Sequence, residues 1–563
     1  MSSLKNGVHS SVDDDDKELL AMGYVPSFKR EFSNLATISF AFSIMGLCSS
    51  IATTLNTPLL LGGPSTVVWC WILGATMCFT LGSSIAEIVS AFPTCGGLYT
   101  ASAQLTPVKY RAIVGWVVGW LNILGQIAGV SSTEFGLSGM ILGAAVIGQD
   151  GAFVVTPGKT VGVFVGLLIL HGLLNSVGTR HLARFTQYFV FVNLGATMRK
   201  SPVFELTASV SSLTDSDHHC AACDHSAKRN ASGVVRVWLG RASQCHRWLE
   251  QRTGVPVWFA FGAVDCAYHC CIARFSLNSL LQMTDYDATA HISEEVRRAA
   301  YAAPAAIFIA GASRRNRSSW LAAKHRSRAV FCKQCTASRS LWLGIPPDHD
   351  SEDGQDGSSH LWVLVCLTAF FVVQTALQAV SRTVFAFSRD HGLPDRGYFG
   401  HNSRLTQTPL RSIWLCTLFS ILPGLLDLAS PAAANAIFSL TAIALDLSYI
   451  IPIGLRRVFQ NHPDVLFKPG PFYMGPGFLG WFANIACITW TLFVCVVFSF
   501  PTLKPVTPLN MNYASVITVG VMALSLFWYV VHAHRHYKGP TSNIGEAAED
   551  SEFYEKEKKG QMA

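Results

Sequence analysis

The chain has 563 residues, of which half are hydrophobic and only 14% are charged, with a formal net charge of +7. Soluble proteins carry roughly 25% charged residues, so this composition excludes an ordinary soluble globular protein. The modest positive charge favours basic loops facing a cytoplasm over a nucleic-acid surface, and we expect no nucleic-acid partner. The sequence therefore predicts an integral membrane protein that crosses the bilayer about a dozen times.

A polar segment, 1–33, opens the chain and is expected to form a cytoplasmic tail with a solvated acidic run at 13–16. A helix needs roughly 20 apolar residues to cross the hydrocarbon core. Ten segments qualify: 35–56, 65–92, 112–133, 160–178, 182–197, 361–385, 409–428, 433–455, 475–500 and 512–533. The apolar stretch 136–149 is short, and we interpret it as an extension of the third span or as a surface helix.

The loops between these spans are alternately rich and poor in basic residues, and this alternation fixes the orientation of the chain in the membrane. Lys29 and Arg30 precede the first span, Lys109 and Arg111 follow the second, and Arg535 follows the last. Both termini are therefore predicted to face the cytoplasm. We divide the chain into a tail at 1–33, transmembrane helices 1–5 at 34–197, helices 8–12 at 361–533, and a cytoplasmic C-terminal tail at 534–563.

The middle of the chain does not follow this pattern. Residues 198–282 and 311–360 are polar and basic, whereas 283–310 between them has the composition of the spans. Because both termini face the same side, the total number of spans must be even. Zero or two further spans are therefore required between 197 and 361, and twelve is the natural total. The segment 283–310 is then the second half of helix six and the start of helix seven.

The first specific motif is Phe42-Ser43-Ile44-Met45-Gly46, inside the first span. Serine and glycine weaken a helix there, and a local break would expose backbone N–H groups to an anion. The alternative is that Gly46 only allows close packing of a neighbouring helix.

The second motif runs from Ala86-Glu87 through Phe92-Pro93 to Gly96-Gly97. A carboxylate near the end of a span is costly unless it has a partner. Proline and then two glycines end the helix and predict a tight cytoplasmic turn. The third motif is Met283-Thr284-Asp285-Tyr286-Asp287, which continues to Glu295. Two acids two residues apart cannot both face lipid, so this segment must line a cavity, break a helix or lie outside the membrane.

Together these motifs resemble the amino acid–polyamine–organocation transporters, and most closely the fungal permeases for 4-aminobutyrate, choline and related amines. The resemblance covers about 20–197, 283–310 and 360–540. It extends to Gly115-Trp116 through Asn122 and Gln126, and to Ser381-Arg382-Thr383 through Leu393-Pro394. It implies an all-α fold of two inverted five-helix repeats plus two extra helices. It also implies a substrate site between broken helices one and six.

Carried over to this sequence, Ser43, Ile44, Met45 and Gly46 would offer N–H groups to a substrate carboxylate at the positive end of a half-helix. The matching break in helix six would be formed by Met283, Thr284, Asp285, Tyr286 and Asp287. Asn122 and Gln126 would contribute to coupling or to structure.

Several of these residues have plainer interpretations. Many relatives carry glycine where Asp285 stands, so its carboxylate would serve a cationic amine or a coupling proton, or else cap the second half-helix. Glu87 is expected to pair with a basic residue and not to carry a proton. His291, Glu294 and Glu295 are interpreted as a solvated salt-bridge network. We expect no metal and no cofactor.

The two aberrant segments also admit a zinc interpretation, because Cys220-x-x-Cys223 and Cys332-x-x-Cys335 have ligand spacing. They lack the apolar periodicity of a domain, so we favour another hypothesis. Shifting the reading frame by one nucleotide restores family-like sequence, which indicates frame-shifted or intron-derived residues at 198–282 and 311–360, or a real lesion. Each Arg or Lys costs roughly 2.5–3.5 kcal/mol at mid-membrane, so helices six and seven are not expected to insert as written.

The predicted function is import of a small amine or amino acid, such as 4-aminobutyrate or choline, by alternating access with proton coupling. We expect the chain to lie in the lipid bilayer of the plasma membrane. No enzymatic activity is expected. Two alternatives remain: a transport-inactive nutrient sensor, and a non-functional product of a mispredicted or damaged gene.

Overall fold

The computed structural model describes residues 15–46, 49–50, 56–148, 153–199, 285, 287–309, 352–403, 405–428, 431–465, 467–500 and 511–540. Almost all of these residues lie in helices or in the turns between them. Within the described ranges there is no β-sheet, and the single isolated bridge joins Phe32 to Val296. The all-helical class predicted from the sequence is confirmed for this part of the chain.

After a short helical segment at 15–21, the first half of the described chain contributes the six labelled helices and one 3₁₀ turn. In chain order they are α2 (Asn34–Met45), α4 (Asn56–Ala91), α5 (Leu98–Gln104), η1 (Val108–Tyr110), α6 (Arg111–Gly148), α7 (Pro157–Asn175) and α8 (Thr179–Arg199). Apolar residues fill most of α4, α6 and α7, which is why these segments form long helices that tolerate internal glycine in a bilayer.

The second half begins with a short irregular region and continues with long helices. The elements are α14 (Ala288–His291), η2 (Ser293–Glu295), a helix at Ala299–Ile309, α17 (Glu352–Arg389), α18 (Leu410–Leu425), η4 (Leu426–Leu428), α19 (Pro431–Val458), α20 (Phe478–Ser499), α21 (Ala514–Val531) and η5 (Ala533–Arg535).

Seven described helices are long and apolar enough to cross a membrane, and they lie within α4, α6, α7, α17, α19, α20 and α21. Three further apolar helices, Asn34–Met45, Ala299–Ile309 and Leu410–Leu425, are shorter. Three of the ten predicted spans are therefore not among these seven, namely 35–56, 182–197 and 409–428. The first and third of these form shorter helices. The total of twelve spans and the inverted repeat stay predictions.

Helix α6 shows what becomes of the short apolar stretch at 136–149. It continues the third span without interruption, so that α6 is one helix of 38 residues. The first of the two interpretations offered for that stretch is therefore confirmed.

The predicted aberrant segments lie almost wholly outside the described residues, and so do the four cysteines of the zinc interpretation. Two ends of these segments are described. Helix α8 reaches Arg199, and α17 begins at Glu352, inside the segment 311–360.

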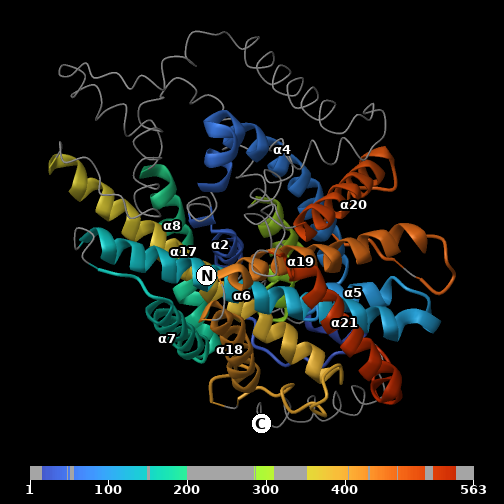
Figure 1. The fold of residues 1–563 in the computed structure, drawn as a ribbon. Helices are drawn as coiled ribbons and strands as arrows, with labels where there is room; N and C mark the ends of the chain where they lie inside the picture. The colour runs from blue at the N-terminus through green and yellow to red at the C-terminus, as the bar shows by residue number, and fades with distance from the viewer. Residues whose placement is uncertain are drawn as a thin grey trace, which may run out of the picture.

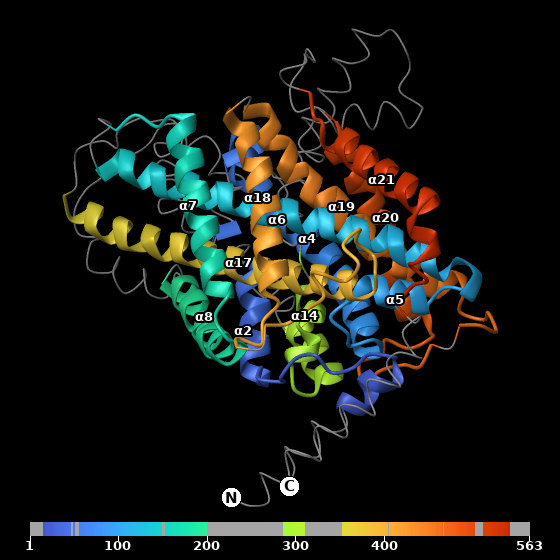
Figure 2. The same cartoon turned by 90° about the horizontal axis from the view of Figure 1, so that it is seen from below.

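The arrangement places α6 and α17 across the centre, with the other helices around them (Figure 1). Helices α7 and α18 lie side by side against α17, and α2 lies beside α8 (Figure 2). Helices α20 and α21 form one edge of the molecule and expose much of their apolar surface, as helices that face lipid do. The short helix α14 is packed against α2 and α17 near the centre.

Candidate functional site

Helix α2 ends at Met45, because Gly46 adopts a left-handed conformation with φ of +46° and its N–H bonds the Ser43 carbonyl. A Cβ added to Gly46 would overlap the side chain of Val372 on α17. The helix end and the close packing, which the sequence offered as alternatives, therefore occur together at this glycine. The Ser43 hydroxyl is buried and has no hydrogen-bond partner among the described residues.

Asp285 and Asp287 are the described residues directly before α14. Asp285 has φ of +64°, and its backbone N–H donates to the Tyr449 hydroxyl oxygen over 3.2 Å. The N-cap of α14 is Asp287, and its side chain makes no capping bond. The interpretation of Asp285 as the cap of the second half-helix is therefore wrong. Met283, Thr284 and Tyr286 lie outside the described residues.

Asp287 is the centre of a buried hydrogen-bond network. Asn122 Nδ2 of α6 donates to Oδ2 over 2.6 Å, and the Tyr449 hydroxyl of α19 donates to Oδ1 over 2.8 Å. His291 Nε2, one turn further along α14, lies 3.0 Å from the same Oδ2. With three partners inside hydrogen-bond distance, the Asp287 carboxylate is held in place by α6, by α19 and by its own helix α14.

The network continues along α6 and into α17. Gln126 Nε2 donates to Asn122 Oδ1 over 2.9 Å, and the Thr383 hydroxyl donates to Gln126 Oε1 over 3.0 Å. Asn122 Nδ2 also approaches the Ser448 hydroxyl at 3.2 Å. The structure thus brings Asn122 and Gln126 together with Asp287, in contact with three helices that the sequence assigned to different regions.

Two further members of this region, Asp446 and Tyr449, were not among the predicted site residues; they lie one turn apart on α19. The Asp446 side chain is fully buried within electrostatic range of Asp285, and its Oδ2 has no hydrogen-bond partner in the described structure. The available signal was a lone aspartate in an otherwise apolar span, which is costly and marks a functional position.

Glu87 lies away from this network, near the end of α4. Its Oε2 accepts from Arg456 at the end of α19, and its Oε1 accepts from the backbone N–H of Met474 over 3.1 Å. Glu87 and Arg456 are both buried. A buried carboxylate with a cation and a backbone donor is positioned to hold α4, α19 and the following loop together.

The acids of η2 form two more ion pairs with the end of α17. Glu294 accepts two hydrogen bonds from Arg389, of 3.0 and 3.2 Å, and Glu295 accepts one of 2.7 Å from Arg382. The expected salt bridges are present, but the prediction that they are solvated is wrong. Glu294, Glu295 and His291 are no more than 2% exposed, because the segment 15–33 and α17 cover them.

Asp390, directly after α17, accepts hydrogen bonds from the hydroxyls of Tyr24 and Tyr99, over 3.0 and 2.8 Å. Burial raises the pKa of Asp390 to about 6, while Arg389 and the two tyrosines act in the opposite direction. Tyr24 belongs to the segment before α2, so this contact ties the start of the described chain to the end of α17.

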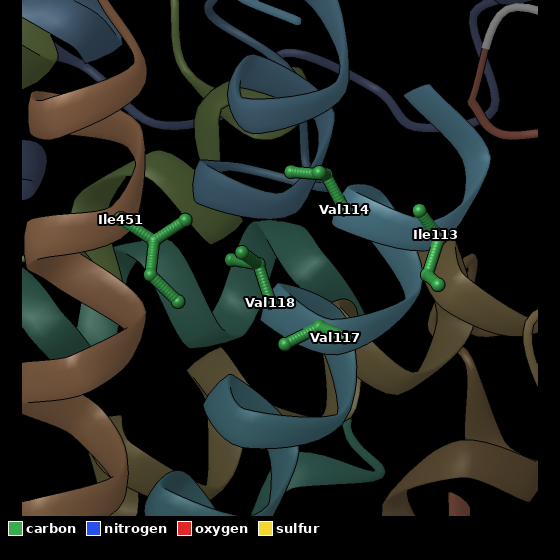
Figure 3. A pocket seen from close by; sticks show the side chains of 5 residues that line it. All are labelled: Ile113, Val114, Val117, Val118 and Ile451. Carbon is green, nitrogen blue, oxygen red and sulfur yellow. The ribbon is translucent and has the colours of Figure 1, made fainter. Parts of the chain in front are cut away.

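A small pocket opens between α6 and α19 (Figure 3). Its lining side chains are Ile113, Val114, Val117, Val118 and Ile451. All five are aliphatic and offer no group that would bind an ammonium or a carboxylate. We therefore place the candidate site at the Asp287 network and not at this pocket.

The family model described as "Amino acid permease" matches residues 32–313 and 356–522. This chain belongs to the amino acid permease family. The matched residues include the three helices that carry the Asp287 network, namely α6, α14 and α19. Members of this family are transport proteins, so this amino acid permease is a multi-pass membrane protein and not an enzyme.

Named relatives agree over nearly the whole length of the permease. It is 38% identical to an uncharacterized amino-acid permease of Schizosaccharomyces pombe, over 98% of this chain and 95% of that protein. It is 32% identical to amino-acid permease 2 of Neurospora crassa, over 96% and 92%. It is 29% identical to the GABA-specific permease of Saccharomyces cerevisiae, over 94% and 87%.

Among solved structures, a manganese transporter of Eremococcus coleocola aligns with 89% of this chain and 95% of its own, at 11% identity and a TM-score of 0.43.

Proposed function

We propose that this permease is a secondary active importer of a small amino acid with a separated amine and carboxylate, with 4-aminobutyrate as the leading candidate. It would work in the plasma membrane, with both termini in the cytoplasm and a proton as the coupling ion. The observation that carries this proposal is the buried carboxylate network at the meeting point of α6, α14 and α19, beside the end of α2.

In this proposal the three acids of the region have different roles. Asp287 already has three partners within 3.0 Å, so it is best suited to hold α14 in position. Asp446 is buried and has one oxygen without a partner, so it has capacity to accept a hydrogen bond from a substrate ammonium. Asp285 lies within electrostatic range of Asp446 and would add negative charge at the same end.

The substrate carboxylate would bind at the other end, where α2 stops at Met45. The Ser43 hydroxyl supplies one donor there, but the C-terminal end of α2 presents carbonyl groups, so the backbone of 43–46 is not the source of N–H donors that the sequence predicted. Support for a γ-amino acid comes from the likeness to the GABA-specific permease of Saccharomyces cerevisiae.

Competition uptake assays in a permease-deficient host test this proposal. Labelled 4-aminobutyrate would be competed with choline and with neutral and cationic amino acids. Replacing Asp446→Asn or Asp285→Gly removes negative charge at the amine end and should weaken 4-aminobutyrate uptake by on the order of tenfold, the effect of one charged hydrogen bond. Thr518→Val on α21, whose hydroxyl donates to the Ala514 carbonyl of its own helix, is the matched control.

Unchanged affinity and selectivity in both aspartate variants would reject the amine assignment. Preference for choline would reject the carboxylate assignment, because choline lacks a carboxylate and requires an aromatic cage. Surface-localised protein without uptake of any competitor would support the nutrient-sensor alternative. Absence of full-length protein from the membrane would support the non-functional product.

The aberrant segments need their own control. The assay would be run with the printed sequence and with a version whose reading frame is restored across 198–282 and 311–360. Sequencing the transcript decides the underlying question, because a message that encodes these residues as written would reject the frame-shift hypothesis.

A further inference from the structure

Glu134 of α6 and His171 of α7 form a buried pair outside the Asp287 network. Their side chains have no exposed surface, and Glu134 Oε2 lies 3.3 Å from His171 Nε2. The other imidazole nitrogen, Nδ1, lies 3.0 Å from Gln374 Oε1 of α17. Phe370 of α17 packs on the imidazole with 4.2 Å between ring centroids. The pair is therefore enclosed by three helices.

This pair is poorly supplied with hydrogen bonds. Several buried polar atoms around it have no hydrogen-bond partner among the described residues: both carboxyl oxygens of Glu134, His171 Nε2, Gln374 Nε2 and Asn175 Oδ1. A buried carboxylate in a structural ion pair is normally satisfied by several donors. Here the acid faces one imidazole and little else, which is unfavourable for a permanently charged group.

The charged side chains on the surrounding helices have other partners or lie elsewhere. Lys159 at the start of α7 bonds the Val154 carbonyl, Arg382 of α17 pairs with Glu295, and Arg411 of α18 lies over Tyr398. Among the side chains of α17 and α18 that the structure describes, the other titratable groups are the thiols of Cys366 and Cys416 and the guanidinium of Arg389, which pairs with Glu294. Burial and the contacts within the pair and with Gln374 therefore control its charge.

The chemistry of the pair follows from its proton count. A protonated carboxyl beside a neutral imidazole and a carboxylate beside an imidazolium contain the same number of protons, and both are neutral overall. Loss of one proton leaves a single negative charge, which is costly in the membrane interior without water. The deprotonated form is favourable only when the site opens to water.

We propose that Glu134 and His171 form a proton-binding site that carries the coupling proton of this permease, separate from the substrate network at Asp287. The pair would take up one proton when open to one side of the membrane and release it when open to the other. This inference rests on the proposed function for the direction and the coupling, but not for proton binding itself.

Two helices connect the sites. Helix α6 carries Asn122 and Glu134, twelve residues or roughly 18 Å apart along one continuous helix. Helix α17 carries Gln374, which contacts His171, and Thr383, which bonds Gln126 of the substrate network. A movement of either helix on substrate binding would therefore change the surroundings of the Glu134–His171 pair.

Infrared difference spectroscopy tests proton binding without any substrate. The purified full chain in lipid would be compared between acidic and alkaline buffer, with Glu134→Gln, His171→Gln and the control Asp446→Asn. We expect a protonated-carboxyl band in the difference spectrum that Glu134→Gln removes, that His171→Gln shifts in its pH dependence, and that Asp446→Asn retains. An unchanged band in Glu134→Gln would overturn the proposal, because Glu134 would then not change its protonation.

A transport measurement tests the coupling. In proteoliposomes loaded with 4-aminobutyrate, Glu134→Gln should reduce accumulation driven by a pH gradient by on the order of tenfold and leave one-for-one exchange nearly unchanged. Equal loss of both activities would show a structural role and overturn the coupling. If no variant and no wild type transports 4-aminobutyrate, the proposed substrate fails, and the infrared result still decides whether Glu134 binds a proton.

Discussion

Asn122 donates a hydrogen bond of 2.6 Å to the carboxylate of Asp287 and so connects α6 with the short helix α14. Because α14 has only four residues, it has little stability of its own and depends on such contacts. The same amide accepts from Gln126, so the bond also positions the link to α17.

Asn122→Ala removes this donor and leaves Asp287 with two of its three partners. We expect the permease to lose about 1–2 kcal/mol of stability, because a buried charged group loses a hydrogen bond. Thermal unfolding in detergent measures the change. In the control Thr518→Val, the lost hydroxyl donates to the Ala514 carbonyl of its own helix, and the change should stay within about 0.5 kcal/mol. Equal stability of the two variants would contradict this role for Asn122.

Gly46→Ala tests the end of α2. Alanine in a left-handed conformation costs about 1–2 kcal/mol, and its methyl would also overlap Val372. We therefore expect a lower melting temperature and reduced uptake. Gly162→Ala on α7 meets no atom within 4 Å of the new methyl and should keep or slightly raise stability. Wild-type behaviour of Gly46→Ala would mean that the chain can continue as a regular helix there.

The pair of Glu87 and Arg456 is suited to a double-mutant cycle. Removing one partner leaves the other charge buried and unpaired, so Glu87→Gln or Arg456→Gln alone should cost about 3–5 kcal/mol. The double variant should cost less than the sum of the two, because no charge remains unpaired. Thermal unfolding of all four proteins measures the coupling, and additive losses would show that the two residues act independently.

Asp390 gives the permease a pH-dependent stability. Its pKa is raised to about 6 in the folded protein from 3.8, so the folded state binds the proton more tightly than the unfolded state. The contribution of Asp390 to the free energy of unfolding is therefore full below about pH 4 and is lost as the pH rises through about 6. Asp390→Asn should flatten the fall of the melting temperature over this range. Asp464→Asn, which removes a half-exposed carboxylate, is the control and should retain the wild-type profile.

The long apolar helices could be predicted from sequence because their length and composition follow directly from the bilayer. The end of α2 at Gly46 was also visible, since serine and glycine interrupt an apolar run. Glu134, His171 and Asp446 were not among the predicted site residues, although each is an isolated titratable residue within a long apolar helix. Their importance depends on which helices meet, and the sequence does not give the distances between α6, α7, α17 and α19.

The prediction that Glu294 and Glu295 are solvated is wrong because of contacts formed in the tertiary structure. A run of charged residues after a short helix is typical of a solvated turn. Here the segment before α2 crosses over it: the Arg30 guanidinium donates to the carbonyls of Ser293 and Val296, and Phe32 pairs with Val296. Contacts between residues more than 260 positions apart are not visible in a local pattern.

The segment 15–33 has a practical consequence for protein engineering. The polar start of this chain invites removal to improve expression, yet Tyr24, Arg30 and Phe32 provide three separate attachments to residues after α14 and α17. A truncation that stops before residue 15 keeps all three attachments. One that extends to residue 33 would uncover Asp390 and the acids of η2, and fluorescent tags are therefore best joined ahead of residue 15.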